Sequence, residues 1–107
     1  MERSERTGNP LSIALLQVEG AIDVLDALRT ELRAYDLVVV MGGHEYMCIL
    51  ADADEQAIRI RFAPIVRRME RRSPRAVVRV GFAEFQAGEA GEALIQRADD
   101  ELLAQRA

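Results

Sequence analysis

Two short runs of β-forming residues, 37–41 and 46–50, are separated only by Gly42-Gly43-His44-Glu45. So short a connection joins strands that run antiparallel, since parallel strands need a much longer crossover. Glycine readily adopts the positive φ that tight hairpin turns require. The segment therefore predicts a β-hairpin, and we expect its two glycines to supply the positive φ of the turn.

The remaining hydrophobic patterns predict strands and helices on both sides of this hairpin. Leu11 to Val18 is almost continuously apolar, as in a strand that is buried on both faces. Apolar residues recur three and four apart over about residues 21–34, as in an amphipathic helix, and alternation over 78–83 predicts a strand. Two further helical stripes consist of Ile58, Phe62, Ile65 and Met69, and of Leu94, Ile95, Ala98 and Leu102.

The resulting order is β-α-β-β-α-β-α, which is typical of an α+β fold with a ferredoxin-like βαββαβ core. In that arrangement an antiparallel sheet carries its helices on one face. A chain of 107 residues is long enough for one hydrophobic core. We expect a flexible polar tail over residues 1–10 and a single domain over 11–107.

The helix that contains Ile58 has signals for its start, its end and its shape. Asp52 or Asp54 can cap its first turn, and Ser73-Pro74 can end it. Pro64 lies inside the apolar stripe and removes one backbone donor, at a cost of about 3 kcal/mol if nothing relieves it. A kink or a break is therefore expected there.

Charge and cysteine content exclude several functions. The net charge is −4 and the sequence pI is about 5.0, which argues against a protein that binds nucleic acid by neutralising phosphates. The single cysteine, Cys48, cannot form an intramolecular disulfide, and its alternation with Tyr46 and Leu50 predicts a small buried side chain. No apolar run approaches the roughly 20 residues that span a bilayer. We expect a cytoplasmic protein without a cofactor.

The residues around the hairpin show a characteristic spacing. Arg33-Ala-Tyr-Asp36 is followed, five residues later, by Gly42-Gly43-His44-Glu45-Tyr46. This spacing resembles the signature of the GGDEF family, the diguanylate cyclase domains that make cyclic di-GMP, in which an RxxD inhibitory site precedes a GG[DE]EF turn. The resemblance extends over roughly residues 11–106 and implies a shortened form of the nucleotide-cyclase fold, which elaborates the same ferredoxin-like core.

Two later segments resemble the family more weakly. Gly81 and Ala83 agree with the strand motif T-x-S-x-G-x-A, although Arg79 replaces its small polar residue. Ala98, Asp99 and Leu102 agree with the closing helix motif A-D-x-A-L. The order and spacing of all the segments support the resemblance better than any one of them does.

The chain departs from the family where the chemistry takes place. The resemblance implies two metal ions held by carboxylates from a D-x-D segment and from the third position of the turn. Here those segments read Gln17-Val18-Glu19 and His44, and Mg²⁺ strongly prefers oxygen ligands. The family's guanine-binding segment has no counterpart between Glu19 and Arg33. We therefore predict a degenerate, catalytically inactive domain. We also predict no metal site, because a single histidine, His44, beside Glu45 and Glu19 seldom forms one.

The resemblance also implies a ligand site at the RxxD segment. In the family, its Arg contacts the guanine edge or phosphate of cyclic di-GMP, its Asp accepts from guanine N–H groups, and a further Arg from the next helix completes the site. Arg33, Asp36 and Arg59 are the corresponding residues, with Arg61 or Arg67 as substitutes for Arg59. A helix-terminal Arg followed by an Asp that opens a strand explains the same pair without a ligand.

The sequence leaves several functions open. The first is an inactive signalling module that senses cyclic di-GMP. The second is a protein–protein interaction or homodimerisation domain that acts through its sheet or through a basic helix end. The third is an enzyme with a repurposed pocket, which no nucleophile–base pair in the sequence supports. The basic helix end consists of Arg67, Arg68, Arg71, Arg72 and Arg75.

Overall fold

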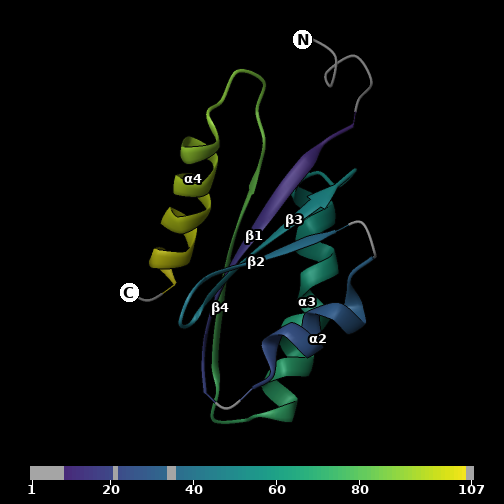
Figure 1. Cartoon of the computed structure of the whole chain (residues 1–107), viewed down its shortest axis with the longest axis vertical. Helices are drawn as coiled ribbons and strands as arrows, with labels where there is room; N and C mark the ends of the chain where they lie inside the picture. Colours follow the sequence, from purple (N-terminus) through teal and green to yellow (C-terminus); the bar gives the residue numbers. More distant parts are fainter. Residues whose placement is uncertain (1–8, 21, 34–35, 106–107) are drawn as a thin grey trace.

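The structure is a computed structural model that describes residues 9–20, 22–33 and 36–105. Its elements confirm the predicted order β-α-β-β-α-β-α (Figure 1). Most of the expected tail, residues 1–8, lies outside the described residues. The elements are β1 (Leu11–Glu19), α2 (Val24–Glu31), β2 (Leu37–Gly42), β3 (Glu45–Ala51), α3 (Glu55–Arg72), β4 (Val77–Glu84) and α4 (Gly91–Ala104).

The four strands form one antiparallel sheet in the order β2-β3-β1-β4. The central strand β1 alternates its side chains between two hydrophobic clusters. Ala14, Leu16 and Val18 pack with α2 and α3 on one face, whereas Ile13 and Leu15 pack with α4 on the other. The prediction that β1 is buried on both faces is confirmed. The prediction that the helices of the βαββαβ core lie on one face is confirmed for α2 and α3, while the last helix, α4, covers the opposite face over β1 and β4 (Figure 1).

Helix α2 is shorter than the predicted 21–34. The Asp23 side chain accepts a hydrogen bond from the Asp26 N–H, which fixes the first turn, and Leu32 has an extended backbone that ends the helix. Val24 and Leu28 are its buried residues. The sequence pattern predicted a buried stripe of Ala21, Leu25, Leu28 and Leu32, but Val24 is buried in place of Leu25, which is half-buried. Ala21 of the predicted stripe lies outside the described residues.

Helix α3 runs unbroken through Pro64, so the predicted break is absent. Pro64 is exposed, and Ile60, whose carbonyl loses the proline as a donor, is 64% exposed. Water can therefore satisfy that carbonyl. Of the two proposed caps it is Asp54 that accepts from the Ala57 N–H, at 2.7 Å. None of the helices in the described ranges is both long and apolar enough to cross a membrane.

The β-hairpin is confirmed, but its turn differs from the prediction. Gly42 pairs with Glu45, which leaves Gly43 and His44 as a two-residue turn. Neither glycine has a positive φ. Instead, the register shifts between Val40 and Gly42, and an extra residue of this kind bends a strand locally. The extra residue, Met41, therefore bends the strand next to the turn, in place of the positive φ predicted for the two glycines.

Candidate functional site

The end of β1 lies against the hairpin turn, so residues of the Gln17-Val18-Glu19 segment and of the turn segment 42–46 come together. The Val18 N–H donates to the His44 carbonyl at 2.9 Å. Gln17 sits between Glu45 of β3 and Arg79 of β4 in the sheet register. It is only 8% exposed, and its Oε1 has no hydrogen-bond partner among the described residues. The buried position near the C-terminal end of β1 thus holds a neutral amide, which lies between one acidic and one basic residue of the neighbouring strands.

The other polar groups near the hairpin turn are exposed or half-buried, as in a turn that is open to solvent. His44 is exposed, as are Gly42, Gly43 and Glu19. Glu45 and Tyr46 are half-buried at the start of β3. In the described parts of the chain, no three side chains of His, Cys, Asp or Glu gather closely enough to hold a metal ion. The turn therefore presents its backbone and one imidazole to solvent.

A second polar cluster forms around Asp36, directly before β2. The Asp36 side chain is fully buried, and its Oδ2 accepts from the Arg33 backbone N–H at 3.0 Å. The Arg33 Nε and an Arg61 Nη1 also approach this oxygen, each at 3.5 Å. Arg33 donates further to the Ala51 carbonyl at 3.2 Å. Two guanidinium groups from different elements thus converge on one buried carboxylate.

The exposures within this cluster are unequal. The Arg33 side chain is 39% exposed and that of Arg61 is 26% exposed, whereas Asp36 is at 0%. Asp36 faces inward towards Cys48. Burial raises the pKa of the Cys48 thiol to about 12, and the nearby charge of Asp36 adds to this effect. Cys48 is the buried, inert thiol that the alternation in β3 predicted.

The structure places Arg59 apart from the Asp36 cluster. Its guanidinium pairs with Glu55 at 2.7 Å and with Glu101 of α4 at 2.8 Å, and lies 4.9 Å from the ring centroid of Phe82. Residues two apart on a helix point in nearly opposite directions. Arg59 therefore faces β4 and α4, and Arg61 takes the position beside Asp36 that the sequence alignment gave to Arg59.

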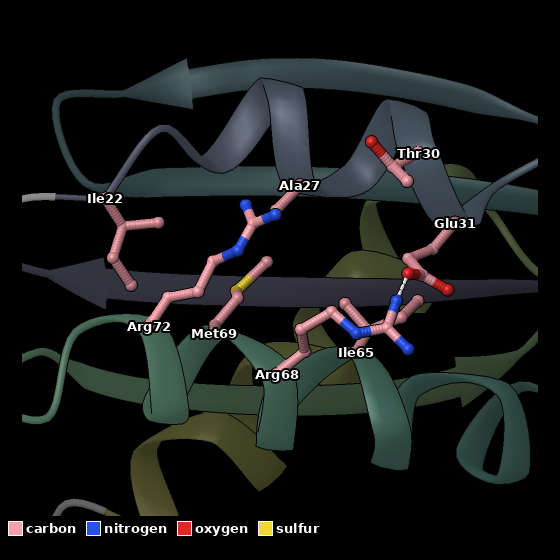
Figure 2. Close-up of a pocket in the computed structure, with 8 residues that line it drawn as sticks. All are labelled: Ile22, Ala27, Thr30, Glu31, Ile65, Arg68, Met69 and Arg72. Carbon is pink, nitrogen blue, oxygen red and sulfur yellow. Dashed lines mark ion pairs between the residues drawn. The ribbon is translucent and has the colours of Figure 1, made fainter.

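The basic end of α3 contributes to a crevice against α2 (Figure 2). Arg68 forms an ion pair with Glu31, and the Arg72 side chain extends towards Ala27. The free volume is about 20 Å³, which is room for about one water molecule. The crevice is thus a packed helix–helix contact and not a nucleotide site. Its lining comprises Ile22, Ala27, Thr30, Glu31, Ile65, Arg68, Met69 and Arg72.

Sequence reasoning missed a set of side chains along the outer edge of β4. Glu101 of α4 and Gln105, the residue that caps this helix, hydrogen bond to the backbone of Phe82 and Val80. Arg97 donates to the Glu84 carbonyl at 2.6 Å. These polar residues flank the apolar stripe of the helix. Hydrophobic periodicity therefore predicts only that they face solvent, and it does not predict their contacts with β4.

The fold is that of a GGDEF domain. The SiaD diguanylate cyclase of Pseudomonas aeruginosa, solved with its activator SiaC, matches 98% of this chain with a TM-score of 0.76 and 24% identity. The GGDEF domain of DgcB from Caulobacter crescentus, solved with c-di-GMP, matches 96% with a TM-score of 0.80 and 19% identity. A microbial GGDEF domain studied with bis-(3′,5′)-cyclic di-GMP matches 96% with a TM-score of 0.82 and 19% identity.

These identities are low, so the likeness is one of fold. The chain spans 49% of the SiaD chain and about three quarters of the other two, at 75% and 76%. No family model and no curated protein sequence matches it.

Proposed function

We propose that this chain is a GGDEF-like signalling module that does not carry out cyclase chemistry. The proposal rests on Gln17, the buried amide at the inner end of β1. Metal-assisted phosphoryl transfer needs hard anionic oxygens to hold the ions. An amide supplies no charge at this position, and the Arg79 cation in the neighbouring register position disfavours a metal ion further. We place the module in the cytoplasm, as its single buried thiol suggests.

A turnover assay tests this proposal. The purified chain incubated with GTP and Mg²⁺ or Mn²⁺ should form no cyclic di-GMP above a protein-free blank. The double variant Gln17→Asp, His44→Asp restores both carboxylates but not the missing guanine-binding segment, so it should stay inactive. Circular dichroism must show both proteins folded, and an active cyclase run in parallel validates the assay. Turnover by either protein would overturn the proposal.

Convergence of Arg33 and Arg61 supports a second function, the sensing of cyclic di-GMP. Both guanidinium groups are partly exposed beside one buried carboxylate, and guanidinium groups are well suited to binding phosphate. Asp36 is buried beneath them, so in this proposal it positions the two arginines and does not itself contact the guanine. This differs from the role that the family resemblance implies for Asp36, and it puts Arg61 in place of Arg59.

Calorimetric titration with cyclic di-GMP tests the sensing proposal. Arg33→Ala and Arg61→Ala should each remove a charge-assisted contact worth roughly 1.5–3 kcal/mol, which weakens binding about 10- to 150-fold. Arg67→Ala is the matched control, because Arg67 is an exposed arginine on the same helix, and it should bind like the unmodified chain. Absence of binding, or equal binding by all three variants, would refute sensing without bearing on the turnover assay.

A further inference from the structure

Helix α4 covers only half of its face of the sheet. It packs over β1 and β4, the two strands farthest from the β2 edge (Figure 1). Met47 and Ile49 of β3 reach the edge of the hydrophobic cluster beneath α4. Their partners in β2 are Val39 and Leu37, and directly paired residues of an antiparallel sheet point to the same face. The half of this face that β2 and β3 form, which we call the open half-face, therefore has no helix over it in the described part of the chain.

The open half-face is apolar and has the dimensions of a short helix. Leu37 is 58% exposed, Val39 is 39% exposed, and Met41, at the hairpin end, is 43% exposed. At about 3.3 Å per residue, the strip from Leu37 to Met41 is roughly 13 Å long, which is more than two turns of a helix. Two strands are together about 10 Å wide, which is the width of one helix.

The hairpin end of the open half-face borders a hollow of about 400 Å³ against α4. Three apolar residues, Leu15, Met41 and Ile95, line this hollow, and no arginine does. It also has three acidic lining residues, Glu45, Glu92 and Asp99. The hollow thus combines an apolar lining with negative charge.

The three carboxylates of the hollow lack counter-charges. Among the described residues, none of their side chains takes part in a hydrogen bond or an ion pair. Elsewhere in the fold, arginines pair with the carboxylates of Glu31, Asp36, Glu55, Glu89 and Glu101. Glu92 lies in the first turn of α4, where the helix dipole favours an acid. Asp99 lies in the middle of the helix, where the dipole has no such effect, so its position needs another reason.

We propose that the open half-face is the docking site for an amphipathic helix of a partner protein with basic residues along one flank. The apolar stripe of that helix rests on β2 and β3, and its basic flank faces α4. Glu92 and Asp99 are seven residues apart, which is about two helical turns. Basic residues at the same spacing on the partner helix can therefore meet both carboxylates.

This chain offers no good occupant of its own. In a second folded copy, α2, α3 and α4 each bury their apolar stripe, so no described helix has a free one. Residues 1–8 contain a single large apolar residue, Met1, which is too few for a strip more than two helical turns long. The charge of the hollow selects a basic partner, and the proposal does not depend on nucleotide binding or turnover.

Fluorescence anisotropy with two designed peptides tests the proposal. Both are fluorescein-labelled amphipathic helices of about five turns with a leucine stripe. One peptide carries Lys seven residues apart on the flank beside the stripe, and the other carries Glu at the same positions. The full chain should bind the Lys peptide, and it should bind the Glu peptide roughly tenfold more weakly, because like charges then meet at α4.

Variants of the apolar strip test where the Lys peptide binds. Leu37→Asn should weaken binding by about tenfold, because a side chain that the peptide buries loses its apolar surface. Ile60→Asn is the matched control, since Ile60 is an equally exposed aliphatic residue, 64% exposed, on α3. It should bind like the unmodified chain.

Variants of the hollow test the charge. The double variant Glu92→Gln, Asp99→Asn should weaken binding of the Lys peptide roughly three- to tenfold. Its matched control is Asp26→Asn, Glu70→Gln, which makes the same change in net charge at two exposed acids of α2 and α3. Equal losses in the two double variants would mean unspecific charge attraction and would overturn the proposal.

Amide chemical shifts of the isotope-labelled, unmodified chain provide a readout that does not rely on any variant staying folded. On addition of the Lys peptide, shift changes should concentrate in β2, β3 and the flank of α4 that carries Glu92 and Asp99. Shift changes centred on α2 and α3, no binding of the Lys peptide, or equal affinity for the Lys and Glu peptides would each overturn the proposal.

Discussion

At the scale of single residues, Gly81 determines how α4 meets the sheet. A Cβ at this position would lie 2.0 Å from the Ala98 carbonyl oxygen and 2.8 Å from the Leu102 nitrogen. Both are backbone atoms of a helix, which cannot move as a side chain can. The absence of a side chain at Gly81 therefore lets α4 pack directly on β4 and bury Ala98 and Leu102.

Gly81→Ala should destabilise the fold by about 3 kcal/mol or more, at the upper end of overpacking changes, because helix and strand must separate. Urea unfolding followed by circular dichroism measures the loss. The matched control is Gly91→Ala at the start of α4, where a Cβ meets nothing within 4 Å, and stability there should hold or rise slightly. Equal stability of Gly81→Ala and the unmodified chain would contradict this account of the packing.

The candidate site shows what single residues reveal before a structure is known. Arg33, Asp36 and the signature turn became candidates only because their spacing resembles that of the GGDEF family. The burial of Asp36 and the choice of Arg61 over Arg59 depend on the rotation of α3 about its axis. Helical periodicity places Ile58 and Phe62 inward, but it does not say which flank of the helix faces Asp36 and which faces Phe82.

At the scale of elements, α3 continues through a proline at which its sequence pattern predicted a kink or a break. Pro64 and Ile60 lie on the exposed flank, away from the buried stripe that ends at Met69. The Ile60 carbonyl that loses a donor is on the side of the helix open to water, while the buried face keeps its packing. The hairpin is a similar case. The sequence predicted its position, whereas the register shift at Met41 arises from the pairing of β2 with β3.

Pro64→Ala should stabilise the protein, because the new N–H can donate to the Ile60 carbonyl and the ring clash disappears. A gain of about 1–2 kcal/mol is expected, since the interior penalty of about 3 kcal/mol is partly offset by the greater freedom of the unfolded chain. Thermal unfolding measures it. Gln56→Ala, also exposed on α3, tests helix propensity alone and should change stability by only a few tenths of a kcal/mol. A lower melting temperature for Pro64→Ala would show that the proline supports a bend that the fold needs.

At the scale of the whole molecule, the continuous apolar run of β1 correctly predicted a central strand with two covered faces. The sequence did not say what covers the second face, because a ferredoxin-like core accounts for only two helices. Helix α4 fills that position, and its apolar stripe of Leu94, Ala98 and Leu102 was read from the sequence without its partner. Periodicity finds the buried side of a helix, whereas its place in the fold comes from the sheet on which it packs.

The hydrogen bonds of Glu101 and Gln105 to β4 have a consequence for growth of the sheet. A sheet with two open edges can recruit strands without end, and that is how fibrils extend. Side chains of Glu101 and Gln105 occupy backbone groups of Val80 and Phe82, so a further strand cannot add at this part of the β4 edge without displacing them.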